Sequence, residues 1–443
     1  MKVLLVQSYL RDKSEPVYPI GLAYIASSLT GHEVRILDLN IAKDPYAELN
    51  AVMASFKPDV AGISLRNIDN QKRIELYYYY KDFELLLKNI NTANPDTIIV
   101  VGGAGFSMFA EEIMKQNPAI NYGIYLEGED VFPELLKNIK EPESVKGIFV
   151  RKHGKVAFTG QRALPDFRRL PPPRRDMIDI TPYLANQSGI GIQTKRGCIL
   201  KCAYCNYPVL NGSVMRLREP AGIVDEIAEL VNRYGVKHFI FADSVFNLPQ
   251  KHAKAICEEI LKRNIKVEWT AWLDIRYVDK GFLLLAAKAG CKSVAFSPDA
   301  ISNSALKALK KGISEDDIWK TVALFTETEE LKKLNVSFGS FINPPGETLA
   351  GLLKTIFFYF RVKLALKRRG GASLNWIRIE PDTEVYNIAL KEGLLDKNTA
   401  LLPNNEKGLK NLFYSRSTLS ISDPVIIGFF KAIELLKKAV RKG

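Results

Sequence analysis

The chain alternates short apolar runs with amphipathic stretches, and this alternation constrains its fold more than any other feature. Over residues 1 to about 135, runs of strand length are separated by segments whose apolar residues recur at helical spacing. The pattern predicts an α/β fold with a doubly wound, Rossmann-like parallel sheet. The predicted strands cover residues 3–6, 33–37, 60–64, 97–101 and 122–126, and the predicted helices cover 21–29, 74–89 and 107–116.

A second alternation of the same kind runs over residues 190 to about 395. Its six apolar runs predict a partial, TIM-like α/β barrel, whose chemistry would lie at the carboxyl ends of the strands. These runs cover 191–193, 238–242, 266–271, 293–296, 335–342 and 372–379. We therefore expect a first sheet domain over 1–140, a linker with a short hairpin and a Pro-rich connector over 141–188, the barrel over 189–395 and a helical C-terminal cap over 396–443.

Composition and charge exclude several classes of protein. With 443 residues, of which 47% are hydrophobic and 25% charged, the chain is long enough for two packed globular domains. Its net charge of +13 is spread along the sequence, without the ladder of aromatic and basic residues that indicates nucleic-acid binding. No stretch approaches the roughly 18 to 20 apolar residues of a membrane span, and the first residues are typical of a strand and not of a signal peptide. We expect a cytoplasmic protein with no membrane span.

Three of the five cysteines lie within eight residues, at Cys198, Cys202 and Cys205. In a reducing cytoplasm this spacing indicates a metal site and not a disulfide framework. Structural zinc normally takes four ligands, whereas an iron–sulfur cluster held by three thiolates leaves one iron open for a substrate or cofactor. The pattern therefore favours a catalytic 4Fe–4S cluster over a zinc knuckle or redox thiols. Cys257 and Cys291 lie in apolar surroundings and are expected to be buried.

The cysteine loop, with the aromatic Tyr204 before its last cysteine, closely resembles the signature of the radical S-adenosylmethionine superfamily. The resemblance implies that the open iron binds the amino and carboxylate groups of S-adenosylmethionine. It also implies contacts to this molecule from later strand ends: Asp243 and Ser244 at the amino group, Ser297 and Asp299 at the ribose or carboxylate, Asn343 and Gly346 at the adenine, and Arg378, on the sixth strand, at a carboxylate. At the adenine-side turn, Asn-Pro replaces the more usual Gly-Gly.

Polar residues and glycines also gather after the strands of the first domain, where parallel sheets bind ligands. No Gly-x-Gly-x-x-Gly turn follows the first strand, which argues against a dinucleotide site. The segment from Tyr18 to Ala26, with the glycines and acidic residues after later strands, resembles the cobalamin-binding domain fused to one large class of radical S-adenosylmethionine enzymes. This resemblance covers about residues 1–395 and implies cobalamin contacts from Tyr18, Pro19, Gly21, Ser64, Gly102, Gly103, Glu127, Gly128 and Glu129.

The cobalt of this cofactor is not expected to take a histidine ligand from the protein. The Asp-x-His-x-x-Gly loop of free-standing cobalamin domains is absent, and His32, the one histidine of the domain, is expected to be structural. Arg66 follows the third strand in an Arg-Asn-x-Asp sequence similar to that of cobalamin-dependent tryptophan C-methylating enzymes. The resemblance implies that Arg66 faces the lower side of the cobalt, where a cation cannot coordinate the metal. The alternative is a salt-bridging residue at the rim of the sheet.

Together these resemblances imply an enzyme that moves a methyl group from S-adenosylmethionine, through cobalamin, to an unactivated carbon of a small-molecule or lipid-like substrate. The cofactors supply the chemistry and the protein supplies the positioning. An enzyme of the same architecture that rearranges, cyclises or oxidises its substrate is the first alternative, and an electron-transfer or cofactor-binding module is the second. An electron donor such as ferredoxin or flavodoxin is expected as a partner, and no nucleic acid.

Overall fold

The structure is a computed structural model that describes residues 1–10, 16–186 and 189–428. The chain forms two compact units, and each is considered by itself. The first unit comprises Met1–Asn70, Tyr77–Leu200 and Tyr207–Val294; the second comprises Gln71–Leu76, Lys201–Asn206 and Ala295–Gly443. Of the helical cap that we expect over 396–443, residues 429–443 lie outside the described part of the chain.

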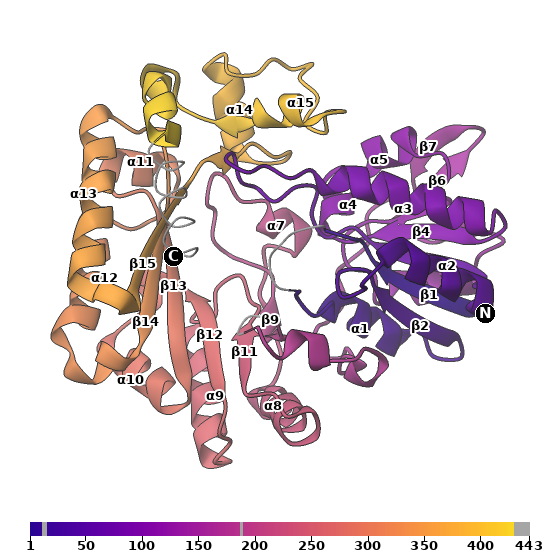
Figure 1. Ribbon diagram of the computed structural model, residues 1–443, viewed down its shortest axis with the longest axis horizontal. Helices are drawn as coiled ribbons and strands as arrows, with labels where there is room; N and C mark the ends of the chain where they lie inside the picture. Colours follow the sequence, from indigo (N-terminus) through magenta and orange to yellow (C-terminus); the bar gives the residue numbers. More distant parts are fainter. Residues whose placement is uncertain (11–15, 187–188, 429–443) are drawn as a thin grey trace. The chain divides into compact units, whose positions relative to one another are not determined.

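The first unit begins with a seven-stranded sheet in the order β2-β1-β3-β4-β5-β6-β7 (Figure 1). Its first five strands are parallel, which confirms the doubly wound fold. The strands are β1 (Lys2–Gln7), β2 (Glu33–Asp38), β3 (Val60–Ser64), β4 (Ile98–Gly102), β5 (Tyr122–Ile124), β6 (Ile148–Lys152) and β7 (Lys155–Phe158). The connecting helices are α1 (Ile20–Ser28), α2 (Pro45–Phe56), α3 (Tyr79–Ala93), α4 (Ala104–Met108), α5 (Ala110–Gln116) and α6 (Val131–Lys137).

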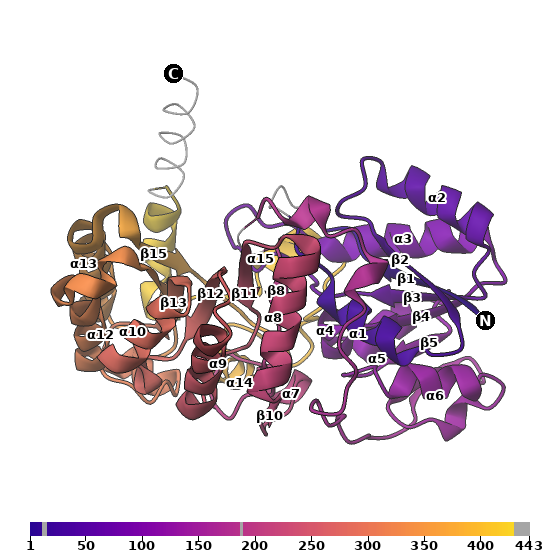
Figure 2. The ribbon, with the colours of Figure 1, turned by 90° about the horizontal axis from the view of Figure 1, so that it is seen from below.

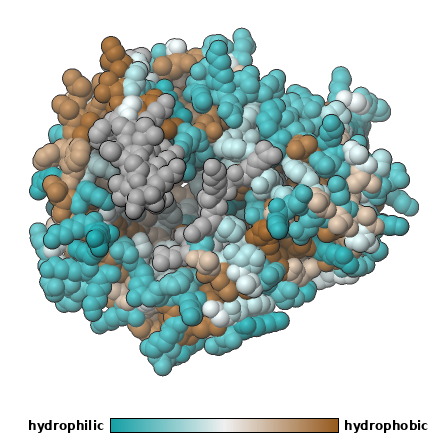
Figure 3. Space-filling view, viewed as in Figure 1, coloured by the Kyte–Doolittle hydropathy of each residue, from teal (hydrophilic) through white to brown (hydrophobic). Residues whose placement is uncertain are grey.

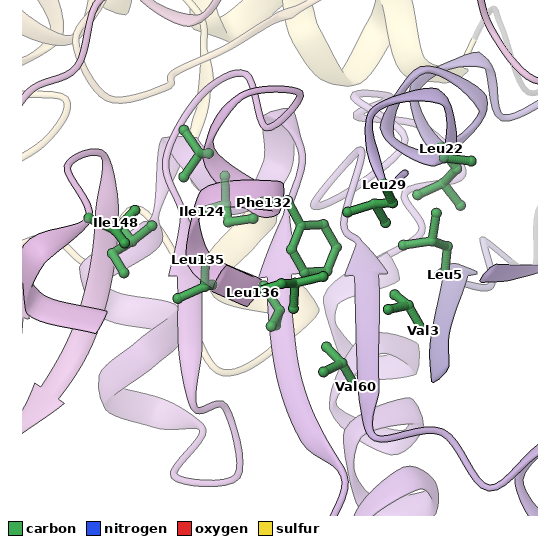
Figure 4. Packing of buried hydrophobic residues seen from close by; sticks show 14 of the residues in the cluster. Val3, Leu5, Leu22, Leu29, Val60, Ile124, Phe132, Leu135, Leu136 and Ile148 are labelled. Carbon is green, nitrogen blue, oxygen red and sulfur yellow. The ribbon is translucent and has the colours of Figure 1, made fainter. Parts of the chain in front are cut away.

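One face of this sheet is covered by α1 and α6. Figure 4 shows Leu5 and Val60 of the strands packed with Leu22 of α1 and with Phe132 and Leu135 of α6. All five side chains are at most 5% exposed. Burial of each such side chain is worth about 1.5–3 kcal/mol, so this layer fixes the strand ends from which the site is built.

Three details of the first sheet differ from the sequence-based prediction. Helices α2 and α6 are missing from that prediction, although Asp44 caps α2 and Pro45 opens it. Helix α3 begins at Tyr79 and not at residue 74, because Asn70 and Tyr77 close a loop with a backbone hydrogen bond. The hairpin that we assigned to the linker extends the sheet instead, since β6 pairs antiparallel with β5.

The rest of the first unit contains the first part of the predicted barrel alternation. Strands β8 (Gly191–Ile192), β11 (His238–Phe241) and β12 (Glu268–Leu273) are parallel, with β11 in the middle. Helices α8 (Pro220–Tyr234), α9 (Gln250–Lys262) and α10 (Lys280–Lys288) follow the strand-helix order of an α/β barrel. A short antiparallel pair, β9 (Lys195–Arg196) and β10 (Arg216–Leu217), brackets the cysteine loop and α7 (Tyr207–Leu210).

The alternation continues in the second unit, and the boundary between the units falls inside β13 (Cys291–Asp299). Strands β14 (Asn335–Phe341) and β15 (Gly370–Asn375) are parallel. The remaining elements are α11 (Asn303–Ala308), α12 (Glu315–Glu327), α13 (Leu349–Leu366), α14 (Glu384–Lys391), α15 (Glu406–Lys410), β16 (Ile377–Arg378) and β17 (Phe413–Tyr414). Ser314 and Asp317 form a capping box at the start of α12, and Thr348 caps α13.

The sixth strand is shorter than predicted. It ends at Asn375, and Arg378 lies on the separate strand β16, which pairs antiparallel with β17. The confirmed fold class is thus a mixed α/β chain with parallel sheets in both alternating regions. In the described part of the chain, no helix is long and apolar enough to cross a membrane. Figure 2 gives the same ribbon from below.

Candidate functional site

A cavity of about 230 Å³ lies at the carboxyl ends of the parallel strands of the first unit. Seven of the predicted cobalamin-binding residues line it: Gly21, Ser64, Gly102, Gly103, Glu127, Gly128 and Glu129. Whole-ligand sites usually measure about 300–1,000 Å³, so this cavity suits one part of a large cofactor, such as a nucleotide tail.

The wall of the cavity depends on residues without side chains. A Cβ atom on Gly103 would lie 2.7 Å from the carbonyl oxygen of Leu65, and its φ of +100° favours glycine as well. A Cβ atom on Gly128 would lie 3.0 Å from Ile25. Larger residues here would displace the backbone or narrow the cavity. Glycine at these positions leaves the space that a closely bound ligand requires.

Buried ion pairs close one side of the cavity. Arg196 donates to Glu127 at 2.8 Å and to Glu129 at 2.7 Å. Arg216 makes a second ion pair with Glu127, and the guanidinium of Arg196 lies 4.4 Å from the ring of Phe167. Burial lowers the pKa of Arg196, but Glu129 and Glu127 outweigh that effect and raise it, so Arg196 stays charged. Neither arginine was a candidate from the sequence.

Tyr18 and Pro19 do not line the cavity. The Tyr18 hydroxyl is buried without a hydrogen-bond partner among the described residues, and burial raises its pKa. Its ring lies 5.3 Å from Tyr183 and 5.1 Å from the guanidinium of Arg175. The carbonyl oxygen of Pro19 accepts the first backbone hydrogen bonds of α1. Tyr18 and Pro19 therefore contact other parts of the protein and not the cavity.

Arg66 lies just beyond the end of β3, and its side chain is exposed. Its carbonyl oxygen accepts a 2.9 Å hydrogen bond from Gly105 at the start of α4. Within the described ranges its guanidinium makes no ion pair, so the alternative of a salt-bridging rim residue has no partner to support it. The guanidinium is available to a bound group.

The cysteine loop begins directly after Arg196. Gly197 has a φ of +91°, and a Cβ atom there would lie 2.1 Å from the carbonyl oxygen of Val214. The backbone N–H of Cys198 donates to Gly212 at 3.0 Å, which holds this buried cysteine against the segment before β10. Ser244 approaches the carbonyl oxygen of Gly197 at 3.5 Å. Only glycine therefore fits at the entry to the loop.

Asp243 supports the strand that leads into this loop. Its buried carboxylate accepts hydrogen bonds from Thr194 N–H at 2.8 Å and Thr194 Oγ1 at 2.5 Å, and lies 3.5 Å from Lys195 Nζ. These bonds give Asp243 a structural role that the sequence did not indicate. Its contact with the amino group of S-adenosylmethionine stays a prediction.

The second unit holds Cys202 and Cys205 beside a buried charge. The hydroxyl of Tyr204 donates to Asp299 Oδ2 at 2.5 Å, and Lys311 Nζ donates to the same oxygen at 2.6 Å. Lys311 Nζ also lies 3.8 Å from Cys202 Sγ. Burial raises the pKa of Tyr204, and Asp299 adds to the effect, so the phenol stays neutral and donates. Lys311 was not a candidate from the sequence.

The donor chemistry of the loop fits an iron–sulfur cluster. Cys198, Cys202 and Cys205 form no disulfide within the described residues, and a cation such as Lys311 stabilises the thiolate form that binds metal. Each thiolate of such a cluster binds a different iron, so the sulfur atoms need not converge on one point. In the parts of the chain that the structure describes, no three His, Cys, Asp or Glu side chains surround a single ion site.

The remaining predicted contacts to S-adenosylmethionine lie in the second unit. Ser297 is half-buried on β13. The amide nitrogen of Asn343 donates to Asp423 at 2.8 Å, while its buried Oδ1 has no partner among the described residues. Gly346 has a φ of +76° and packs against α11, where a Cβ atom would lie 2.7 Å from Ala308. Arg378 is buried and donates to Leu401 at 3.0 Å. The contacts described here are all within the protein, so the predicted contacts of these residues with S-adenosylmethionine stay predictions.

Two family models match the chain in sequence order. A B12 binding domain matches residues 12–136, and the Radical SAM superfamily matches residues 192–358.

Individual relatives agree with the two models. An uncharacterized methyltransferase of Pyrococcus horikoshii is 28% identical over 409 residues, covering 89% of this chain and 84% of the relative. The tryptophan 2-C-methyltransferase of Streptomyces laurentii is 24% identical over 414 residues, covering 75% of this chain and 66% of that enzyme. The solved structure of the radical S-adenosylmethionine methyltransferase TsrM from Kitasatospora setae, with cobalamin and a 4Fe–4S cluster bound, matches with a TM-score of 0.75 at 25% identity. That match covers 90% of this chain and 76% of TsrM.

Proposed function

Because this chain belongs to the radical S-adenosylmethionine enzymes that carry a cobalamin-binding domain, we propose that it methylates an unactivated carbon of a small-molecule or lipid-like substrate. The observation that carries this proposal is the match of 90% of the chain to a methyltransferase of this architecture. When bound, the 4Fe–4S cluster, S-adenosylmethionine and cobalamin supply the electron and the methyl group. The chain supplies the sites that hold them.

The cluster site consists of the thiolates of Cys198, Cys202 and Cys205. Three ligands leave one iron open, and S-adenosylmethionine would bind there through its amino and carboxylate groups. The short hydrogen bond from Tyr204 and the ion pair with Lys311 hold Asp299 in place at the end of β13. The contacts of Asp243, Ser244, Ser297, Asn343, Gly346 and Arg378 with S-adenosylmethionine are part of the proposal.

The cobalamin site consists of the glycine-lined cavity of the first unit. Gly102, Gly103 and Gly128 leave space at the ends of β4 and β5, and this space supports binding of the nucleotide tail. Arg66 is exposed beside the same strand ends, which supports a position at the lower face of the corrin. A guanidinium cannot coordinate cobalt, so the metal would keep a weakly bound lower face and release its methyl group more easily.

The decisive experiment uses anaerobically purified protein, reconstituted with iron and sulfide and loaded with cobalamin. S-adenosylmethionine carrying a labelled methyl group is added with a chemical reductant, and S-adenosylhomocysteine and 5′-deoxyadenosine are measured. We expect S-adenosylhomocysteine from the loaded protein and none when all three cysteines are alanine. The same protein with cobalamin omitted is the matched control, because it keeps the cluster.

The products separate the alternatives. A substrate that gains one methylene unit in mass supports methylation. 5′-Deoxyadenosine without S-adenosylhomocysteine, together with a product of unchanged or lower mass, would replace the proposal with a rearranging, cyclising or oxidising enzyme. If neither nucleoside forms, the chain is an electron-transfer or cofactor-binding module.

The proposal includes an electron donor such as ferredoxin or flavodoxin, since the cluster must be reduced before each cleavage of S-adenosylmethionine. A cytoplasmic location would provide that donor. We also propose that cobalamin binds within residues 1–140 and the cluster within residues 189–395, as predicted from the sequence. Because β6 and β7 extend the first sheet, limited proteolysis should cut after β7 and before residue 189 if the two sites lie in separate domains.

A further inference from the structure

Helix α13 of the second unit is apolar on two opposite faces. Its inner face buries Leu352, Phe358 and Val362, and the ring of Phe358 lies 5.6 Å from Phe338 of β14 and 5.0 Å from Trp319 of α12. This packing holds the helix to the unit. Packing against the unit does not account for the apolar residues on the outer face of the helix.

The outer face carries five large apolar side chains, which we call the α13 stripe. They are Leu349, Leu353, Phe357, Phe360 and Leu364, and they are 63%, 58%, 59%, 49% and 76% exposed. At 3.6 residues per turn their positions fall within an arc of about 80°, along about 22 Å of the helix. Figure 3 shows hydrophobic residues gathered over the part of the surface where Figure 1 draws α13. Contiguous exposed patches of this kind mark interaction sites.

Cations stand on both sides of the stripe. Lys354 and Arg361 flank one edge and Lys363 flanks the other, and Lys367 and Arg368 follow at the C-terminal end, all of them exposed. Helix α13 contains no aspartate or glutamate. Arg361 lies 4.7 Å from the ring of Trp319 and 5.5 Å from that of Phe357, so its charge is held beside the stripe.

We propose that α13 is a membrane-contact surface that lies in the plane of an anionic phospholipid bilayer. An apolar strip of Leu and Phe with Lys and Arg along its edges is the arrangement by which helices lie in a bilayer interface. The apolar side chains enter the acyl boundary while the long basic side chains reach the phosphates. The chain's net charge of +13 favours the same partner. Membrane contact by α13 is independent of the proposed methylation, and neither proposal requires the other.

Sedimentation of the full-length chain with vesicles tests the proposal. Vesicles of phosphatidylcholine and phosphatidylglycerol in equal amounts are compared with vesicles of phosphatidylcholine alone, at low and high salt. We expect binding to the mixed vesicles and little to the neutral ones. The Arg361→Gln, Lys363→Gln double variant should bind about thirtyfold more weakly, from the loss of two cations near the surface. Binding that is equal on the two vesicle types, or that no salt concentration weakens, would overturn the proposal.

Substitution of the stripe tests its apolar part. Leu353→Glu and Phe357→Glu should each abolish vesicle binding, while Leu261→Glu on α9, whose side chain is 40% exposed, should leave it unchanged. The thermal unfolding midpoint of all three should match that of the parent chain. Retention of vesicle binding by Leu353→Glu would refute the role of the stripe.

A tryptophan at Phe357 gives a second readout in a chain that stays folded. In Phe357→Trp, the extra emission should be that of a solvent-exposed indole and should shift to the blue when mixed vesicles are added. An emission that is already blue-shifted and does not respond to vesicles means that residues 429–443 or a second copy of the chain cover the stripe, which would refute membrane contact. The tryptophan emission does not depend on cofactor loading, so failure of this test would leave the proposed methylation unaffected.

Discussion

The ammonium group of Lys311 lies 3.8 Å from the Sγ atom of Cys202. The same group makes a 2.6 Å ion pair with Asp299, and both side chains are buried. A thiolate that binds iron carries part of the charge of the cluster, so a buried cation beside it stabilises the reduced cluster more than the oxidised one. Asp299 offsets part of that effect without removing it, because its oxygen also accepts a hydrogen bond from Tyr204.

Lys311→Met should therefore lower the reduction potential of the cluster. A unit charge about 6 Å away at an effective dielectric constant of about 20 is worth ~3 kcal/mol, and because Asp299 is unchanged in the variant we expect a shift of roughly 120 mV for one electron. An EPR-monitored redox titration of the reconstituted protein measures it. Lys310→Met is the matched control, because Lys310 pairs with Glu384 at the surface. A fully loaded variant with an unchanged potential would contradict this role.

The buried ion pairs beside the cavity should matter for stability. Glu127→Gln leaves Arg196 and Arg216 without part of their compensating charge, and loss of one partner of a buried pair costs about 3–5 kcal/mol. Since the amide keeps some of the hydrogen bonds, we expect a loss at the lower end of that range. Urea unfolding measures it. The control is Glu134→Gln, whose pair with Arg162 is partly exposed and worth at most about 1 kcal/mol.

Gly102→Val should remove cobalamin binding and leave the fold intact. A Cβ atom on Gly102 would meet Ile124 at an ordinary 3.6 Å, so the backbone does not need to move. The added side chain would fill part of a cavity of about 230 Å³. We expect at least tenfold weaker uptake of cobalamin, measured by corrin absorbance after gel filtration. Gly371→Val on β15 has a matching 3.6 Å contact away from the cavity and should bind normally; equal binding by both variants would argue against this cavity as the cobalamin site.

Features that depend on residues close together in the sequence could be predicted from the sequence alone. The strands of the first sheet lie within one or two residues of their predicted positions, because a buried parallel strand needs an apolar run whatever surrounds it. The three cysteines became candidates through their spacing, and the strand-end glycines through the resemblance to a cobalamin-binding domain. The roles of both sets stay predictions.

Arg196 and Lys311 could not be identified in the same way. Nothing near Lys311 in the sequence indicates that its ammonium group approaches Cys202, 109 residues earlier in the chain. Arg196 finds its two carboxylates about 70 residues away, although its place directly before the Gly-Cys of the loop was a usable signal. Arg378 is a different case: the structure shows its guanidinium donating to the carbonyl oxygen of Leu401, and its contact with a carboxylate of S-adenosylmethionine stays a prediction.

For Arg66, the resemblance to tryptophan C-methylating enzymes implies a position facing the lower side of the cobalt. Its side chain is exposed and makes no ion pair in the described part of the chain, so Arg66→His should change the free energy of unfolding by less than about 0.5 kcal/mol. If residue 66 faces the lower side of the corrin, the new imidazole can coordinate the metal. Nitrogen hyperfine splitting should then appear in the EPR spectrum of the cobalt(II) form, and methyl transfer should slow because the lower face is now occupied. Arg35→His, at an exposed position on strand β2 of the same sheet, is the control that should add no splitting. A spectrum of the Arg66→His protein identical to that of the parent chain, at equal corrin content, would place Arg66 away from the cobalt.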